Sequence, residues 1–332
     1  QLNALLPVIY GEQATLETLA VADDDVDMTL LPIVLLINLA IGRTSVLADF
    51  NPRKPQTFEP AAVWQQIEQQ QVTSLTAAPY YVEKFADFCL KRTAATSIRK
   101  IFCGGSTIFP AAAQKISQAF PRAEIHFIYG STEAEPIAHL TATDLIRQHP
   151  DLLLNKGLCV GEPAESLEVA IVYLEAKLVA NCTGIDFENA RCAANEIGEI
   201  CVRGPHVLQR YLNHEQVMRD NKYRLSGNVI WHRTGDAGYL DENGWLYLTG
   251  RCREIIHWKG SEYYPLVFEN NAQQWLPGVE ATLLSVDNQP YVVVAPDENR
   301  KAVLGIFGEK LPETATWPVV FIKQLPRDKR HF

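Results

Sequence analysis

The first half of the chain alternates short apolar runs with segments in which apolar residues recur every three or four positions. The short runs are rich in β-branched residues and predict strands at Thr44–Ala48, Val72–Thr76, Lys100–Cys103 and Ile125–Tyr129. The helical spacing between them predicts helices at Ala61–Gln71, Tyr81–Leu90 and Pro110–Phe120. This alternation indicates an α/β fold with a mostly parallel sheet covered by helices.

The pattern changes near Gly157. Beyond it, strand-like runs follow one another with Gly, Asn and Asp turns between them, and few helical windows intervene. These runs are Leu167–Tyr173, Lys177–Ala180, Gly198–Val202 and Trp245–Leu248. They predict a small antiparallel β subdomain.

A third region follows Gly250 and mixes both patterns. It predicts a helix at Pro265–Trp275 and strands at Tyr291–Ala295 and Val319–Lys323. We therefore expect three parts: an α/β region over 1–157, the β-rich subdomain over 158–250, and a small α+β C-terminal domain over 251–332. The last boundary is placed at Arg251–Arg253.

Composition narrows the class of partner. The formal net charge of the 332 residues is −9, and no Lys- or Arg-rich block is present, which argues against nucleic acid as the main partner. The seven cysteines form no CxxC pair, so a reduced, cytoplasmic protein without a zinc site is expected. The most apolar run, Met28–Gly42, is too short to span a bilayer and is expected to be buried core.

Two glycine-containing segments follow predicted strands of the first region. Tyr129, Gly130, Ser131, Thr132 and Glu133 come at the end of one strand, where ligands of open α/β sheets bind. Here glycine allows close approach of a phosphate, Thr132 can donate a hydrogen bond to it, and Glu133 can bind magnesium. The alternative is an ordinary strand-to-helix turn with a threonine cap.

The second segment is Gly104, Gly105 and Ser106, which precedes a predicted helix. Paired glycines permit a flat ligand to lie against the backbone, although a plain turn between strand and helix explains them equally well. No GxSxG pattern frames Ser106, so it is not a nucleophile elbow.

A carboxylate and a guanidinium stand near the boundary of the third region. Asp236, in a Thr-Gly-Asp run, can accept hydrogen bonds from both hydroxyls of a ribose. Arg251 presents planar donors that suit a ribose or a phosphate. A hairpin aspartate and an interdomain salt bridge are the structural alternatives.

Taken in order, these segments resemble the motifs of the adenylate-forming enzymes, the superfamily of acyl- and aryl-coenzyme A synthetases. The resemblance covers nearly the whole chain and depends on Tyr129–Glu133, Val160–Pro163, Gly198–Ile200, Arg233–Asp236 and Gly250–Arg251. It implies ATP-dependent activation of a carboxylic acid to an acyl adenylate, with coenzyme A as the usual acceptor of the acyl group. The apolar residues expected around the acyl group favour a fatty or otherwise apolar acid.

The resemblance also implies roles for individual residues. By position, the cofactor-binding set that borders adenine, acyl group and phosphate is Gly104, Gly105, Ser106, Tyr129, Gly130, Ser131 and Thr132, with Tyr129 on the adenine and Thr132 at the α-phosphate. Glu133 would hold Mg²⁺ and, with Thr132, serve catalysis. Asp236 would bind the ribose hydroxyls with help from Arg251.

Other features qualify this resemblance. The Leu31-Pro32 run, Cys159–Gly161 and the ending Pro326–Phe332 resemble the branch that forms β-lactones in olefin synthesis, where the adenylate of a β-hydroxy fatty acid closes on itself. Arg253 stands where the superfamily usually has aspartate or lysine. The phosphate loop and the late catalytic lysine are missing, and Lys329 is not assigned that role. The chain is therefore expected to be a fragment, and a non-catalytic nucleotide-binding homologue is the alternative.

Overall fold

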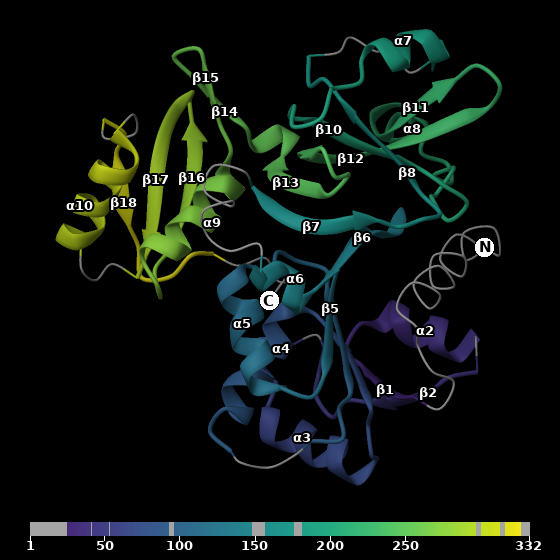
Figure 1. Cartoon of the computed structure of the whole chain (residues 1–332), viewed down its shortest axis with the longest axis vertical. Coiled ribbons are helices and arrows are strands. Elements are labelled where there is room, and N and C mark those ends of the chain that lie inside the picture. The colour runs from purple at the N-terminus through teal and green to yellow at the C-terminus, as the bar shows by residue number, and fades with distance from the viewer. Residues whose placement is uncertain are drawn as a thin grey trace.

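The computed structural model describes residues 25–40, 42–52, 54–92, 96–147, 157–175, 181–296, 300–312 and 316–326. The predicted strand Lys177–Ala180 and the chain end that carries Lys329 lie outside these residues. In Figure 1 the first strands and their helices form the lower part of the molecule, a group of antiparallel strands the upper right, and the last strands and helices the upper left.

The first strands form the parallel half of one continuous sheet in the order β2-β1-β3-β4-β5. Four of them match predicted strands, whereas β1 was not predicted. The strands are β1 (Val26–Thr29), β2 (Thr44–Leu47), β3 (Ser74–Ala77), β4 (Lys100–Gly104) and β5 (Glu124–Ser131).

Helices separate these strands along the chain, as the alternating pattern predicted. They are α2 (Pro32–Ala40), the 3₁₀ helix η1 (Pro55–Thr57), α3 (Pro60–Gln69), α4 (Pro79–Cys89), α5 (Pro110–Ala119) and α6 (Ala142–Arg147). Proline at the first turn starts α3, α4 and α5, where its missing N–H costs no hydrogen bond. The apolar stripe of α3 is buried through Val63, Trp64 and Ile67, so the predicted alternation is confirmed.

Antiparallel strands continue the same sheet in the order β6-β7-β13-β12-β10-β8, with β11 beside β12 and β9 beside β11. The elements are β6 (Ala134–Thr141), β7 (Leu158–Pro163), β8 (Glu168–Val172), β9 (Asn181–Cys182), α7 (Gly184–Asn189), β10 (Gly198–Arg203), α8 (Glu215–Asn221), β11 (Lys222–Leu225), β12 (Val229–Leu240) and β13 (Leu246–Arg251). The β-rich character beyond residue 157 is confirmed.

Strand β7 hydrogen-bonds to strands on both sides of the predicted boundary at residue 157. His139 of β6 pairs with Glu162, and Leu246 of β13 pairs with Gly161. Gly161 has φ of +92°, and a Cβ there would lie 2.0 Å from the carbonyl oxygen of His139, so a side chain cannot be accommodated. One sheet therefore runs across residue 157. The predicted domain boundary between residues 157 and 158 stays a prediction.

The third region has its own apolar core, in which Phe268, Val294 and Phe307 are buried. Its elements are η2 (Cys252–Glu254), β14 (Ile256–Trp258), β15 (Ser261–Tyr263), α9 (Pro265–Trp275), β16 (Glu280–Val286), β17 (Gln289–Ala295), α10 (Arg300–Lys310) and β18 (Val319–Phe321). The predicted bounds of α9 are confirmed. Leu266 of α9 packs instead into the core of the first region, which fixes the start of this helix against the sheet.

The apolar run Met28–Gly42 is only partly core, contrary to expectation. Met28 is fully buried in β1, but Leu36 and Leu39 of α2 are 55% and 64% exposed. The helix turns one face to the sheet, so the apolar residues on its other face meet solvent. Among the described residues, none of the helices combines the length and the hydropathy that crossing a membrane requires.

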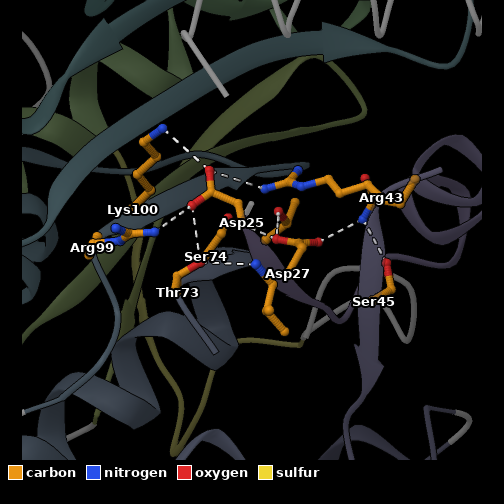
Figure 2. Close-up of polar contacts among 11 residues, drawn as sticks. Asp25, Asp27, Arg43, Ser45, Thr73, Ser74, Arg99 and Lys100 are labelled. Atoms are coloured by element: carbon orange, nitrogen blue, oxygen red, sulfur yellow. Dashed lines mark hydrogen bonds and ion pairs between the residues drawn. The ribbon is translucent and has the colours of Figure 1, made fainter. Parts of the chain in front are cut away.

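A buried polar network fixes β1 within the sheet (Figure 2). Asp27 is fully buried and accepts hydrogen bonds from Asn38, Ser74 and Thr76. Burial raises the pKa of Asp27, and the nearby Arg43 charge and these donors oppose that rise. These hydrogen bonds link β1 to α2 and β3. Each of the three donors is buried away from water and needs a partner within the protein, which Asp27 provides.

Candidate functional site

A cavity of about 350 Å³ opens where the two halves of the sheet meet the third region. The ends of β4 and β5 form one wall through Gly105, Ser106 and Tyr129, and β12 and the end of β13 form another through Asp236 and Arg251. The start of α9 closes a third side. Segments more than 100 residues apart therefore surround one space.

Asp236 is the polar centre of this cavity. Its Oδ2 accepts a hydrogen bond from the Tyr129 hydroxyl at 2.7 Å, and its Oδ1 lies 2.9 Å from the Arg251 guanidinium. Burial raises the pKa of Asp236, whereas the Arg251 charge and the Tyr129 hydrogen bond oppose the rise. Arg251 is itself 55% exposed, so its remaining donors stay accessible to a ligand.

The register of the sheet brings these groups together. Asp236 of β12 stands directly opposite Arg251 of β13. The Thr234 hydroxyl accepts a hydrogen bond from the Asp236 N–H at 3.0 Å and donates to the Ile200 carbonyl, which ties this part of β12 to β10. The Asp236–Arg251 pair therefore lies on rigid strands. Asp236 thus belongs to a strand of the β12–β13 hairpin, whose turn begins at Asp241, and its ribose-binding role stays a prediction.

The Tyr129–Glu133 segment forms a tight hairpin between β5 and β6. Ser131 pairs with Ala134 across the turn, so the alternative of a strand-to-helix turn is wrong. A Cβ at Gly130 would lie 2.9 Å from the Ala134 carbonyl oxygen and 3.0 Å from the Glu135 carboxyl carbon. The hairpin itself therefore requires glycine at this position.

Glu133 and Thr132 stand outside the cavity lining. Thr132 is exposed, and the carboxylate of half-buried Glu133 accepts a hydrogen bond from the Tyr211 hydroxyl at 3.1 Å. Gly104 is also outside the lining. A Cβ there would lie 2.8 Å from the Ile128 carbonyl oxygen of the neighbouring strand. The predicted residues that line the cavity are Gly105, Ser106, Tyr129, Gly130, Ser131, Asp236 and Arg251.

Two acidic cavity residues of the third region were missed in the sequence. Glu254 and Glu269 line the wall opposite the strand ends. Glu269 accepts a hydrogen bond from the Thr282 hydroxyl, and burial raises its pKa to about 7, with the Glu254 charge acting in the same direction. The available signal was an acidic residue directly after the apolar run Leu266–Phe268.

Glu269 is expected to make stability depend on pH. Its folded pKa of about 7 exceeds the ordinary 4.5, so the stability from the protonated carboxyl is complete below pH 4.5 and is lost as pH rises through 7. Glu269→Gln should remove this loss and be more stable than wild type at pH 8 by roughly 1–3 kcal/mol, with near equality at pH 4.5. Urea unfolding at both pH values measures this, and exposed Glu242→Gln should show no such pH-dependent difference.

The comparisons with known proteins agree with this geometry. A family model described as "AMP-binding enzyme" matches residues 27–212, more than half of the chain. The chain belongs to the AMP-binding enzyme family. The match ends before β12 and β13, so the placement of Asp236 and Arg251 in the cavity rests on the structure.

Family relatives include an olefin β-lactone synthetase from Xanthomonas campestris, 27% identical over 307 residues, a match that covers 87% of this chain and 54% of that protein. A 4-coumarate–CoA ligase from Narcissus pseudonarcissus is 26% identical over 257 residues, with 75% and 42% coverage. The chain thus spans about half the length of these curated relatives or less.

Solved structures share the fold. O-succinylbenzoate coenzyme A synthetase from Bacillus subtilis, in complex with AMP, has a TM-score of 0.75 at 22% identity and matches 98% of this chain and 63% of that one. An amide bond synthetase from Marinactinospora thermotolerans has a TM-score of 0.74 at 22% identity, with 96% and 62% coverage. These similarities confirm the predicted α/β fold with its antiparallel and C-terminal parts.

Proposed function

We propose that this chain supplies the ribose and adenine side of the nucleotide site in an enzyme that activates a carboxylic acid with ATP, forming an acyl adenylate and pyrophosphate. The observation that carries the proposal is the joint position of Tyr129, Asp236 and Arg251 around one cavity, beside the Gly105–Ser106 turn. The family membership and the AMP complex of the B. subtilis synthetase support it.

In this proposal Asp236 accepts hydrogen bonds from the two ribose hydroxyls. Each carboxylate oxygen already has one partner, but it keeps a second lone pair for a hydroxyl. Arg251 adds a charge and further donors at the sugar, and the Tyr129 ring bounds the space where the base would lie. Gly130 and Ser131 also belong to the lining, and in this proposal they would border the phosphates.

Glu133 is the proposed residue for Mg²⁺, and Thr132 for the α-phosphate. Mg²⁺ is usually held by one or two carboxylates together with substrate phosphates and water, and the half-buried Glu133 carboxylate at the hairpin tip fits such a set. When bound, the metal would offset the repulsion between carboxylate and phosphate. Thr132 is exposed at the same turn and can donate to a phosphate.

The acid is proposed to be fatty or otherwise apolar. Away from Asp236 the cavity is lined by apolar side chains that suit an apolar acyl group, namely Ile108, Phe127, Leu140, Leu145, Leu158 and Leu266. Coenzyme A is the proposed acceptor. Closure to a β-lactone is the second candidate, because olefin β-lactone synthetases from two bacteria, 27% and 29% identical, are among the relatives. All seven cysteines are free, which supports the cytoplasm as the compartment.

Pyrophosphate exchange tests the proposal. We expect acid-dependent exchange of labelled pyrophosphate into ATP by a longer protein that includes the regions its relatives have and this chain does not span. Fatty, aryl and β-hydroxy fatty acids are assayed with and without coenzyme A. Thioester formation would support coenzyme A as the acceptor. Lactone formation without coenzyme A would support closure to a β-lactone. ATP binding without exchange for any acid would favour a non-catalytic nucleotide-binding homologue.

A further inference from the structure

Lys222 is a fully buried lysine that the proposed mechanism does not use. It begins β11 directly after α8, stands opposite His232 of β12, and is 1% exposed. Burial lowers its pKa to about 8, while the Glu133 charge acts in the opposite direction. Burial also lowers the pKa of His232 to about 4, with the Lys222 charge adding to this. At pH 7 a buried ammonium therefore lies beside a neutral imidazole.

The ammonium of Lys222 is bound to the loop that follows β10. Its Nζ donates a hydrogen bond to the Leu208 carbonyl oxygen and lies 5.5 Å from the centroid of the Tyr211 ring. The N–H of the same Leu208 donates to the backbone carbonyl oxygen of Glu133 at 2.7 Å. One residue of the loop thus joins Lys222 to the turn between β5 and β6.

Tyr211 completes a second connection between this loop and the same turn. Its hydroxyl donates to Glu133 Oε1 at 3.1 Å, and its backbone N–H lies 3.2 Å from the Met218 sulfur in α8. The Glu133 carboxylate is therefore oriented by a phenol whose ring rests against the Lys222 ammonium. Burying an ammonium costs several kcal/mol in desolvation. An apolar side chain would fill the same space without this cost, so the contacts made by the charged group need an explanation.

We propose that Tyr211 and Lys222 are positioning residues that hold the Glu133 carboxylate in the orientation needed by magnesium-bound ATP. This inference rests on the proposed function, which places the metal at Glu133. Hydrogen bonds to the far side of a ligating carboxylate fix its orientation, and their loss typically lowers metal affinity or activity 10- to 100-fold. Tyr211 acts directly on the carboxylate, and Lys222 acts through the Leu208–Tyr211 loop.

Calorimetry with ATP measures the role of Tyr211 without catalysis. The ratio of ATP dissociation constants in EDTA and in excess Mg²⁺ gives the benefit of the metal. We expect Tyr211→Phe to lower this ratio about tenfold and to leave binding in EDTA unchanged. Tyr173→Phe is the matched control, because its hydroxyl donates to the Glu196 carboxylate at 2.7 Å, away from the cavity, and it should keep the wild-type ratio.

Two further variants separate positioning from general destabilisation. Glu133→Gln should abolish the metal benefit, and adding Tyr211→Phe to it should change nothing more. Lys222→Met should lower the same ratio and speed hydrogen exchange at the Leu208 amide, while Lys222→Arg, which keeps a charged donor, should restore part of both. Urea midpoints of all variants show whether the fold is intact.

The outcomes distinguish this inference from the proposed function. If wild type binds ATP no better with Mg²⁺, or not at all, the proposed function fails and the inference fails with it. If Glu133→Gln abolishes the metal benefit but Tyr211→Phe and Lys222→Met keep it, the metal assignment stands and the positioning role is wrong. An equal loss of ATP affinity in EDTA and in Mg²⁺ for Tyr211→Phe or Lys222→Met would also contradict the positioning role, because such a loss indicates damage unrelated to the metal.

Discussion

Asp236→Ala is expected to weaken ATP binding about 100-fold. In the proposed complex the Asp236 carboxylate accepts hydrogen bonds from two ribose hydroxyls, and a hydrogen bond to a charged group is worth about 1.5–3 kcal/mol. Two bonds at the lower limit total about 3 kcal/mol, which is roughly two factors of ten in the dissociation constant. Arg251→Met removes a guanidinium that is 55% exposed together with its ion pair to Asp236, and because solvent screens that charge the change should cost about tenfold or less.

A nucleotide without ribose hydroxyls separates this role from a general loss of structure. Wild type should bind 2′,3′-dideoxy-ATP about 100-fold more weakly than ATP, whereas Asp236→Ala should bind the two equally. Calorimetry with both nucleotides completes the cycle. An unchanged ATP dissociation constant in Asp236→Ala, or the same preference for ATP in both proteins, would show that Asp236 does not contact the sugar.

The sequence located Asp236 and Arg251 but not their partners. The Tyr129 hydroxyl donates a hydrogen bond to Asp236, which lies 107 residues away in the sequence. This contact depends on the order of the strands in the sheet, β5-β6-β7-β13-β12. Apolar periodicity within a strand carries no information on that order. The structure therefore adds to the role proposed for Tyr129: besides a ring beside adenine, it has a hydroxyl that holds the carboxylate proposed to bind the sugar.

The glycines show a second reason why the sequence could not specify the site. Gly105 has φ of +89°, and a Cβ added there would meet no neighbouring atom within 4 Å, so its backbone is free to meet a ligand, as its sequence context suggested. Gly104 and Gly130 are instead crowded by neighbouring strands. A glycine needed for ligand approach and one needed for strand packing look the same in the sequence, and only the tertiary neighbours distinguish them.

Strand β1 escaped prediction for a related reason. Polar and apolar residues alternate from Asp25 to Leu30, which favours a half-buried strand, but two of the polar positions are aspartates, a residue that is depleted in strands. Both acids are buried, because cationic and hydroxyl groups from β2, β3, β4 and their flanking residues surround them (Figure 2). A buried charge becomes compatible with a strand only when such partners arrive from distant segments. Asp25 has most of the cationic partners, so its replacement tests this charge compensation most directly.

Asp25→Ala is expected to lower the free energy of unfolding by about 3–5 kcal/mol. Asp25 is 1% exposed and forms ion pairs with Arg43 at 3.8 Å and with Arg99 and Lys100 at 3.3 Å. Its removal leaves the Arg43 guanidinium, only 6% exposed, with Asp27 as the nearby acidic group and without its Asp25 partner. Urea unfolding followed by far-ultraviolet circular dichroism measures the change.

The neighbouring cations provide the controls for this experiment. Arg99 is 57% exposed, so Arg99→Ala should cost no more than about 1 kcal/mol. Adding Arg43→Met to Asp25→Ala should recover part of the loss, because the buried guanidinium that lost its Asp25 partner is then removed as well. A cost below about 1 kcal/mol for Asp25→Ala, or a double variant less stable than the sum of the two single changes, would show that Arg43 does not depend on Asp25 for its compensation.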